Sequence, residues 1–469
     1  MTLIIVILLI LGYLLIATGH LTGVNKAAIA MFIGTVGWVV YICWGSDFVM
    51  SQHPHEYAEF LAGGLPTSDA VKHFIYDSIF LRYVGRAASI VMFLLATMSI
   101  IEILDNNGCF DFIQEWVRTR NSKRVLWTLS LATFILSANL DNLTTATMML
   151  VVMHQIVRSR AQRMLVGASV VIAANCGGCF TVIGDPTGLI LWGDGAITAT
   201  NFSKYLALPA LVAWIIPTIL INRQLPARLD IEWTAPPYRG DDTNLNRWQR
   251  VVMLFVGIGG LWFIPTFHNI TKLSPFLGAL CVLSVLWVVN EAFNRKLNDA
   301  DQMTQRRIPR SIQYGTIQQM LFVMGIMMGM GVMCETGVLG DISAWIDYNV
   351  HNIWIVGVIS GCLSSFVDTF TVAITNISLY PVIDGTHLGQ WADSDYLSGY
   401  VMNGDYWKVV AYSTAVGGCL LSVGSTSGLA LMKMEHVKLG WYLKNLTPKV
   451  LCGWALGYAI LWVECILMN

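Results

Sequence analysis

The chain has 469 residues, of which 55% are hydrophobic and only 12% are charged, and its formal net charge is −1. This composition is far more apolar than that of a soluble domain, so we expect the lipid bilayer as a partner and no nucleic acid. Ten cysteines lie mostly in apolar segments, where cysteine packs as a small hydrophobic residue, and they predict no disulfide framework.

Several apolar segments are long enough to cross a bilayer as helices, which takes about 20 residues. They include residues 3–19, 27–45, 87–105, 203–222, 250–267, 272–292, 316–333 and 449–467. No basic residue precedes the first segment and no small-residue cleavage site follows it closely, so we expect an uncleaved helix rather than a signal peptide. Residues 46–85 have no clear counterpart later in the chain and predict an external amphipathic insertion.

One pattern of glycines occurs twice with the same spacing. Its members are Gly177, Gly178, Gly184 and Gly188, and again Gly417, Gly418, Gly424 and Gly428. Because glycine loosens a helix and Pro186 removes a backbone donor, residues 165–198 and 408–433 predict broken transmembrane helices. Upstream of each pattern lies an apolar hairpin with an aspartate near its tip, Asp141 in 125–157 and Asp368 in 352–381.

The distribution of basic residues predicts how the hairpins face the membrane. Both flanks of the first hairpin are basic, with Arg120, Lys123, Arg124, Arg158, Arg160 and Arg163. The positive-inside rule then places both of its ends in the cytoplasm, as expected of a re-entrant segment. No Lys or Arg lies between Arg310 and Lys408, so both ends of the second hairpin are expected outside.

These signals together predict an all-α polytopic membrane protein built from two repeats of inverted topology. The repeats are residues 1–224 and 249–469, each with three spans, a re-entrant hairpin, a broken transmembrane helix and a closing span. A cytoplasmic linker, residues 225–248, joins them, and both termini are expected to be external.

Three aspartates in these interrupted segments are candidate functional residues: Asp141, Asp185 and Asp368. An ionised carboxylate inside a bilayer is costly and marks a functional site by default. Burial favours the protonated acid and a bound cation favours the carboxylate, so such a group can exchange a proton for a metal ion. The alternative is that each aspartate only caps a half-helix.

Neutral oxygen ligands surround these aspartates in the sequence, and oxygen-rich sites suit hard cations. They are the hydroxyls of Thr144, Thr145, Thr187, Thr371, Ser425, Thr426 and Ser427. Glu102 and Asp105 end the third span, and Glu335 lies near the matching place in the second half. These three residues are candidates for a proton path. The alternative is that they are helix caps or acids at the membrane interface.

Three weaker signals favour structural roles. Cys176 and Cys179 have the spacing of a redox motif, but the second copy lacks the first of them, which favours packing. His53, in the expected insertion, is interpreted as part of a solvated loop. Arg86, at the start of the third span, is expected to extend to the membrane interface.

At these residues the chain resembles the NhaD-type sodium/proton antiporters of the ion transporter superfamily. The best portion is residues 98–172, which include Glu102, Asp105 and the specific string from Ser137 to Thr145. The resemblance implies exchange of cytoplasmic sodium, or lithium, for external protons, without a cofactor beyond the transported ions. It also implies a homodimer in a bacterial inner membrane, with the hairpin tips meeting near the midplane.

By this resemblance, polar positions of the family fall on particular residues of the chain: Asp141, Asn142, Thr144, Asp185, Glu335 and Asp368. It implies sodium at Asp141, Asn142, Asp185 and Asp368. The chain departs from the family where Asp368 is followed by Thr369 rather than asparagine, and where Pro186 and Thr187 follow Asp185. Both departures lie in the expected site, so they concern ion selectivity.

Two other functions were weighed. A sodium-coupled carboxylate symporter of the same architecture would bind through Ser-Asn-Thr motifs, which Ser137 and Asn139 match only in part, and aspartates at the tips would repel an anion. An intramembrane aspartyl protease could use Asp141 and Asp185, but Val182 stands where such enzymes have a second glycine. We therefore expect a transporter and no enzyme.

Overall fold

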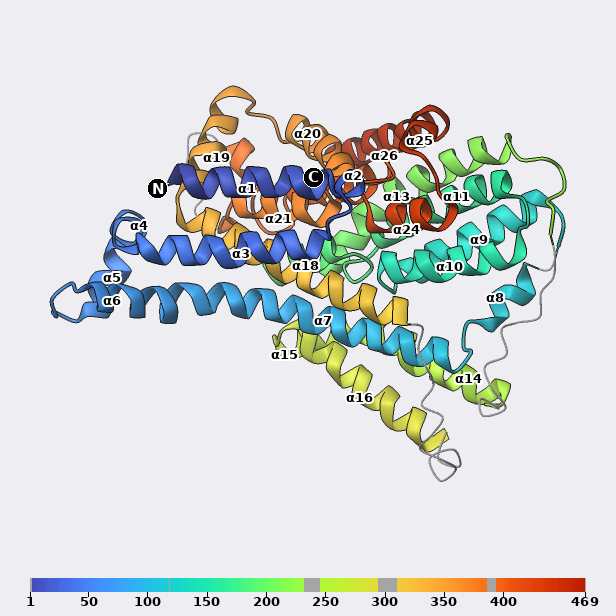
Figure 1. The fold of residues 1–469 in the computed structure, drawn as a ribbon, viewed down its shortest axis with the longest axis horizontal. Coiled ribbons are helices and arrows are strands. Elements are labelled where there is room, and N and C mark those ends of the chain that lie inside the picture. Colours follow the sequence, from blue (N-terminus) through green and yellow to red (C-terminus); the bar gives the residue numbers. More distant parts are fainter. Residues whose placement is uncertain (1, 118, 232–244, 294–309, 386–393, 469) are drawn as a thin grey trace.

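The computed structural model describes residues 2–117, 119–231, 245–293, 310–385 and 394–468, and most of these lie in helices (Figure 1). Among these described residues, β-structure is limited to isolated bridges, such as that between Val157 and Ile231. Seven helical segments in these ranges are long and apolar enough to cross a membrane. The chain is therefore a multi-pass, all-α membrane protein, as predicted. Of the expected linker, residues 232–244 lie outside the described ranges.

The seven segments agree with all the predicted spans except the first. They are Lys26–Cys43, Ser68–Asn106, Ala199–Asn222, Arg247–Thr271, Pro275–Phe293, Ile317–Glu335 and Thr447–Leu467. Residues 3–19 form α1 (Thr2–Ala17), which has 16 residues and is followed by the single turn α2 (Gly19–Thr22). At 1.5 Å per residue α1 reaches about 24 Å, which is short of a hydrocarbon core of about 30 Å. The first span therefore stays a prediction, since α1 by itself is shorter than the hydrocarbon core.

The third span is much longer than predicted. One helical segment of 39 residues comprises α6 (Ser68–Phe74), the π-helical turn η1 (Ile75–Phe80) and α7 (Leu81–Asn106). Residues 68–85, expected in the external insertion, are helical and continuous with the third span, with Phe74 and Ile75 buried. At 1.5 Å per residue the 39 residues reach about 58 Å, which exceeds a hydrocarbon core of about 30 Å. Part of the segment therefore projects from the bilayer, and the external position of residues 68–85 stays a prediction. The rest of the insertion folds into short helices at one end of the molecule, and α8 lies at the other end (Figure 1).

Two helical hairpins and two broken helices form the centre of the fold. The hairpins are α9 (Ser122–Ser137) with α10 (Asn142–Ile156), and α20 (Ile353–Phe366) with α21 (Thr369–Leu379). The broken helices are α11 (Arg160–Gly178) with α12 (Pro186–Gly193), and α23 (Asp405–Gly417) with α24 (Thr426–Glu435). The hairpins lie toward opposite ends of the long axis (Figure 1).

Both halves make the same hydrogen bond between hairpin and broken helix. The Ser137 hydroxyl donates to the carbonyl of Ala174 at 2.6 Å, and the Ser364 hydroxyl donates to that of Thr414 at 2.7 Å. Ala174 and Thr414 are 240 residues apart, as are the two copies of the glycine pattern. The repetition seen in the sequence is therefore also a repetition of contacts.

The recurring glycines allow the interrupted segments to fold back on themselves. A Cβ on Gly188 would meet the backbone of Val182 at 3.0 Å, and a Cβ on Gly428 would meet the backbone of Ser422. Side chains larger than hydrogen would push these backbones apart. The same requirement for close approach explains why glycine stands at both positions.

The other helices surround this centre. α3 (Lys26–Cys43) packs along α18 (Arg310–Glu335), where a Cβ on Gly325 would collide with the backbone of Ala30, and α13 (Ala199–Asn222) packs along α26 (Thr447–Met468). The remaining elements are α4 (Gly45–Gln52), α5 (Pro54–Leu61), α8 (Asp111–Trp116), α14 (Arg247–Leu254), η2 (Phe255–Gly259), α15 (Gly260–Thr271), α16 (Pro275–Phe293), α19 (Val338–Asn349), α22 (Ser394–Ser398) and α25 (Leu439–Asn445).

A buried carboxylate joins the first hairpin to both broken helices at the α8 end. The Glu435 side chain, at the end of α24, is 1% exposed and accepts hydrogen bonds from Nε of Arg163 at 2.8 and 2.9 Å. His154 Nδ1, on α10, lies 2.7 Å from the same carboxylate. Arg160 donates only to the backbone carbonyls of Glu435 and His436. The cluster holds α10, α11 and α24 together through one desolvated charge.

We predict that Arg163→Gln destabilises the protein by about 3–5 kcal/mol, because it leaves the Glu435 carboxylate buried without its main counter-charge. Arg160→Gln is the matched control and should cost about 1 kcal/mol, since it removes bonds to carbonyls only. Thermal unfolding of the purified variants in detergent measures both. Equal losses in the two variants would contradict the assignment of Glu435 as the linking charge.

Candidate functional site

Each of the three candidate aspartates begins a half-helix and caps it. Asp141 Oδ2 accepts from the backbone N–H of Leu143 and Thr144, both at 3.1 Å, at the start of α10. Asp185 Oδ2 accepts from Thr187 N at 3.0 Å at the start of α12, and Asp368 Oδ2 from Phe370 N at 3.2 Å at the start of α21. Ser425 caps α24 by accepting from Gly428 N at 3.1 Å. The capping alternative weighed from the sequence is thus part of the structure.

Capping occupies one oxygen of each carboxylate and leaves the other available. Asp141 Oδ1 has a long contact of 3.4 Å from the Gln319 amide of α18. Asp185 Oδ1 accepts from Asn142 Nδ2 at 2.6 Å. Asp368 Oδ1 is buried and has no hydrogen-bond partner among the described residues. A capping role and an ion-binding role are therefore compatible in the same side chain.

An amide and hydroxyl network connects the two halves beside Asp185. The Asn142 amide also donates to Asn175 Oδ1 at 3.2 Å, and Asn175 Nδ2 donates to the hydroxyls of Ser427 at 2.8 Å and Ser425 at 3.3 Å. The first hairpin, both broken helices and their caps thus meet through side-chain oxygens. Further buried hydroxyls with no partner among the described residues are those of Thr145, Thr187 and Thr371.

The aspartates are desolvated and lack a cationic hydrogen-bond partner. Asp141, Asp185 and Asp368 are 3%, 4% and 2% exposed, and no ion pair of the described ranges includes them. Asp185 is within electrostatic range of the other two. Lys26, at the start of α3, is within range of Asp368, but its buried ammonium makes no hydrogen bond to a described residue.

The remaining predicted residues are placed as follows. Thr144 donates its hydroxyl to Asp141 Oδ2 at 3.3 Å, and the methyl of Thr369 packs where a Cβ on Gly418 would stand. No three His, Cys, Asp or Glu side chains of the described chain converge as a metal-ion cluster would require. The site is therefore distributed over several half-helix ends rather than gathered around one set of carboxylates.

The three candidates for a proton path do not form one path. Glu335 accepts the Tyr83 hydroxyl near the start of α7. Glu102 follows Tyr83 by 19 residues on the same helix, which is about 29 Å along its axis. Asp105 lies one turn further still. Glu102 and Asp105 thus belong to the α8 end, whereas Glu335 belongs to the α4–α6 end (Figure 1).

Two residues of the site were missed from the sequence, Gln319 and Asn175. Asn175 lies two residues before the first glycine of the repeated pattern, but Ala415 replaces it in the second copy, so comparing the copies did not select it. Gln319 is an amide within the apolar span at 316–333. Amides in apolar helices are the signal that could have identified both, because a buried amide needs partners.

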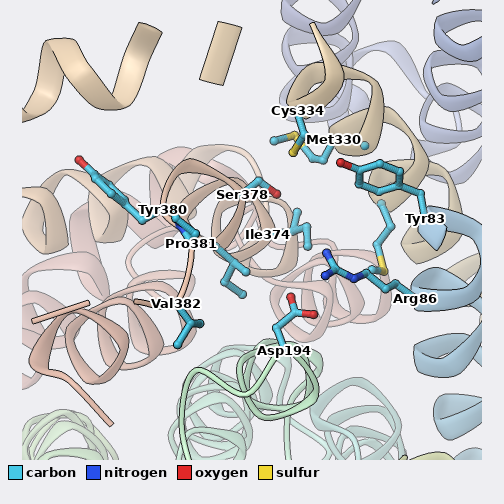
Figure 2. Close-up of a pocket in the computed structure, with 13 residues that line it drawn as sticks. Tyr83, Arg86, Asp194, Met330, Cys334, Ile374, Ser378, Tyr380, Pro381 and Val382 are labelled. Atoms are coloured by element: carbon cyan, nitrogen blue, oxygen red, sulfur yellow. The ribbon is translucent and has the colours of Figure 1, made fainter. Parts of the chain in front are cut away.

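A cavity of about 420 Å³ opens between α7, α18 and α21 (Figure 2). Tyr83 and Arg86 of α7, Cys334 of α18 and Ser378 of α21 line it, and Asp194 at the end of α12 faces Arg86 across it. Arg86 is exposed and its side chain points into this cavity, and its extension to the membrane interface stays a prediction. The cavity separates α7 and α18 from the hairpin and the broken helix.

His53 also departs from its predicted role as part of a solvated loop. Its Nε2 lies 2.6 Å from Oε2 of Glu335, and its side chain is only 18% exposed. The turn between α4 and α5 carries it onto the end of α18. Cys176 and Cys179 are buried and unpaired, consistent with the packing role predicted for them.

Comparison with known proteins gives several relatives named as sodium/proton antiporters. The chain is 30% identical over 378 residues to "Sodium/proton antiporter 1" of Arabidopsis thaliana, which is 80% of the chain and 62% of that relative. It is 28% identical over 374 residues to "Sodium/proton antiporter 2" of the same plant, covering 80% of the chain and 84% of the relative. It is 28% identical over 410 residues to "Na(+)/H(+) antiporter NhaD" of Vibrio cholerae, covering 81% and 78%.

These relatives confirm the resemblance to NhaD-type proteins, although the chain spans less than two thirds of the first of them. A family profile described as "Citrate transporter" (CitMHS) matches residues 1–392. This match covers most of the chain, including both hairpins and the first broken helix. The chain therefore belongs to the citrate transporter family.

Proposed function

We propose that the protein exchanges sodium, or lithium, for protons across the membrane. The observation that carries this proposal is that three carboxylates are buried without an ion pair at the ends of half-helices. A buried carboxylate is stable only when protonated or when a cation lies beside it. Protons and sodium would therefore compete for these groups, and that competition couples their movement in opposite directions.

Within the site, we propose that Asp141 and Asp185 hold the sodium. Each has one oxygen fixed by a helix N-terminus, while its second oxygen meets only a neutral amide, from Gln319 for Asp141 and from Asn142 for Asp185. The amide oxygen of Asn142 and the hydroxyl of Thr187 lie on the same half-helix ends, and the Ser425 hydroxyl caps α24 beside them. Such hard oxygen ligands suit sodium and lithium.

The names of the relatives support the same function, since those reported above are called sodium/proton antiporters. The family description "Citrate transporter" keeps carboxylate symport as the alternative. That alternative is less favoured because Asp141 and Asp368, at the tips of the hairpins, would repel an anion unless bound cations compensated for them.

We predict that Asp141→Asn abolishes sodium/proton exchange while leaving the protein folded. Asparagine can still cap α10 through its side-chain oxygen, but it can neither carry a negative charge nor take up a proton. The measurement uses proteoliposomes with a proton gradient and a pH-sensitive dye, to which sodium, lithium, potassium or choline chloride is added. Wild-type protein should dissipate the gradient with sodium or lithium and not with choline.

The matched control is Asp341→Asn, because Asp341 is exposed on α19 and should be dispensable. Normal exchange by Asp141→Asn would refute the assignment of the site. A wild-type protein that responds to none of the cations would refute antiport itself, and sodium-driven uptake of labelled citrate would then test the symport alternative.

We further propose that the α4–α6 end faces outside and the α8 end faces the cytoplasm, with both chain termini external. The basic residues that flank α9 and α10 lie at the α8 end, and the positive-inside rule supports that side as cytoplasmic. The two halves would then have inverted topology, and the localisation proposed from the bacterial relatives is the inner membrane.

This orientation predicts opposite labelling of two introduced cysteines in intact cells. Leu65, 84% exposed between α5 and α6, and Arg223, exposed at the end of α13, stand at the two ends. The background should have serine at the exposed cysteines, which are Cys43, Cys281, Cys362 and Cys452. A membrane-impermeant maleimide should label Leu65→Cys and spare Arg223→Cys until the cells are opened. The reverse pattern would invert the proposed orientation.

We also propose a homodimer, with its contact on the least buried spans. Only 22% of the Arg247–Thr271 window and 28% of the Pro275–Phe293 window are buried within the chain, so these helices face lipid or a second copy. The protein mass in native mass spectrometry from detergent should then be twice 51.9 kDa. A mass of one chain under conditions that retain exchange activity would exclude the dimer as a requirement.

A further inference from the structure

We propose that Glu56, His53, Glu335 and Tyr83 form a proton relay between the surface of the α4–α6 end and the cavity of Figure 2. The proposal rests on the proposed antiport and assigns a role to the segment at 46–67, which the transport site itself does not use. Protons enter the relay from water at that surface, and they leave it into the cavity at Tyr83, which lines the cavity wall.

The four groups are linked by consecutive short contacts. Nδ1 of His53 lies 3.3 Å from Oε2 of Glu56, and Nε2 lies 2.6 Å from Oε2 of Glu335. The Tyr83 hydroxyl donates to the other oxygen of Glu335 at 2.8 Å. Three separate elements supply these side chains: the turn between α4 and α5, the end of α18, and the start of α7. Each inner group therefore touches the next through a different atom.

Exposure falls along the chain of groups from the surface inward. The side chain of Glu56 is 54% exposed, that of His53 18% and that of Glu335 8%. Tyr83 then lines the cavity. A structural ion pair does not require side-chain exposure to fall from one group to the next. A proton relay does, because one end must contact water and the other must reach the cavity.

The chemistry of each group permits a proton to pass along the relay. A proton from water or Glu56 binds Nδ1 of His53 as Nε2 gives its proton to Oε2 of Glu335, since imidazole can accept at one nitrogen and donate at the other. The Tyr83 hydroxyl then turns from Glu335 toward water in the cavity, and the protonated Glu335 transfers its proton to the Tyr83 oxygen as the tyrosine's own proton leaves to that water. Reorientation of the His53 ring and of the Tyr83 hydroxyl resets the relay, because each passage leaves the imidazole proton on Nδ1. The reverse sequence carries a proton outward.

The cavity places the outlet of this relay beside the second hairpin. Ile374 and Ser378 of α21 line it, and Asp368 caps the same helix six residues before Ile374, or about 9 Å along its axis. Other titratable or charged groups around the relay and its outlet are Tyr41, Arg86, Asp194, Cys334 and Tyr380. Protons released at Tyr83 thus enter a cavity that α21 also lines.

The test compares His53→Gln with the control His55→Gln in reconstituted protein. Glutamine can still donate a hydrogen bond to Glu335, which preserves an anchoring role, but it cannot accept a proton and pass on another. Exchange by His53→Gln should fall on the order of 10²-fold when the α4–α6 side is alkaline and recover as that side is acidified. The sodium concentration for half-maximal exchange should be unchanged. His55 is exposed, and its variant should retain the wild-type pH profile.

Chemical rescue gives an independent reading. In His53→Ala, imidazole added to the solution should restore exchange, because the free base can occupy the space and carry the proton. Tyr83→Phe should reproduce the pH-dependent loss without rescue, since its missing hydroxyl lies beyond the histidine. A pH profile of His53→Gln equal to that of the control, or no rescue by imidazole, would overturn the relay.

A measurement without transport separates this proposal from the proposed function. Ring nitrogen NMR shifts of His53 in labelled protein should change with Glu335→Gln and not with Glu59→Gln, whose side chain is on the exposed part of α5. Unchanged shifts in Glu335→Gln would overturn the relay whether or not the protein exchanges sodium. A wild-type protein that does not exchange, with the expected NMR shifts, would instead refute antiport and leave the coupled pair established.

Discussion

The rest of the structure depends on three carboxylates that are buried without a cationic partner. Asp141, Asp185 and Asp368 stand at the N-termini of half-helices, where backbone N–H groups and the helix dipole stabilise negative charge. Continuous transmembrane helices could not offer such ends at this depth. The hairpin tips, the breaks after Gly178 and Gly417, and the glycines that let backbones meet are all consequences of placing charge there.

The two oxygens of each carboxylate have different roles. One oxygen caps the helix and fixes the side chain, and the second faces an amide or no described partner. Asn142 and Asn175 connect Asp185 to Ser425 and Ser427, so the two halves share one polar network. Replacement of one partner therefore changes the hydrogen bonding of the whole network rather than of one bond.

α18 makes polar contacts both at the centre of the fold and at the α4–α6 end. Gln319 reaches Asp141 near the centre, and Glu335 meets His53 and Tyr83 at the α4–α6 end. In the cavity beside α18, Arg86 of α7 and Asp194 at the end of α12 point toward one another (Figure 2). At the opposite end, Glu435 joins α10, α11 and α24 through Arg163 and His154. Polar contacts thus occur at both ends and at the centre.

The sequence by itself determined the all-α membrane architecture and the positions of its interruptions, because apolar length, repeated glycines and Pro186 act locally along the chain. It also selected the three aspartates, since a charge within an apolar segment is conspicuous without a structure. Tertiary structure alone decided that Asn142 meets Asp185, that Gln319 meets Asp141 and that His53 meets Glu335, which are pairs separated by 43, 178 and 282 residues. It also decided that residues 68–85 extend a span, because their apolar face is buried by packing on distant helices.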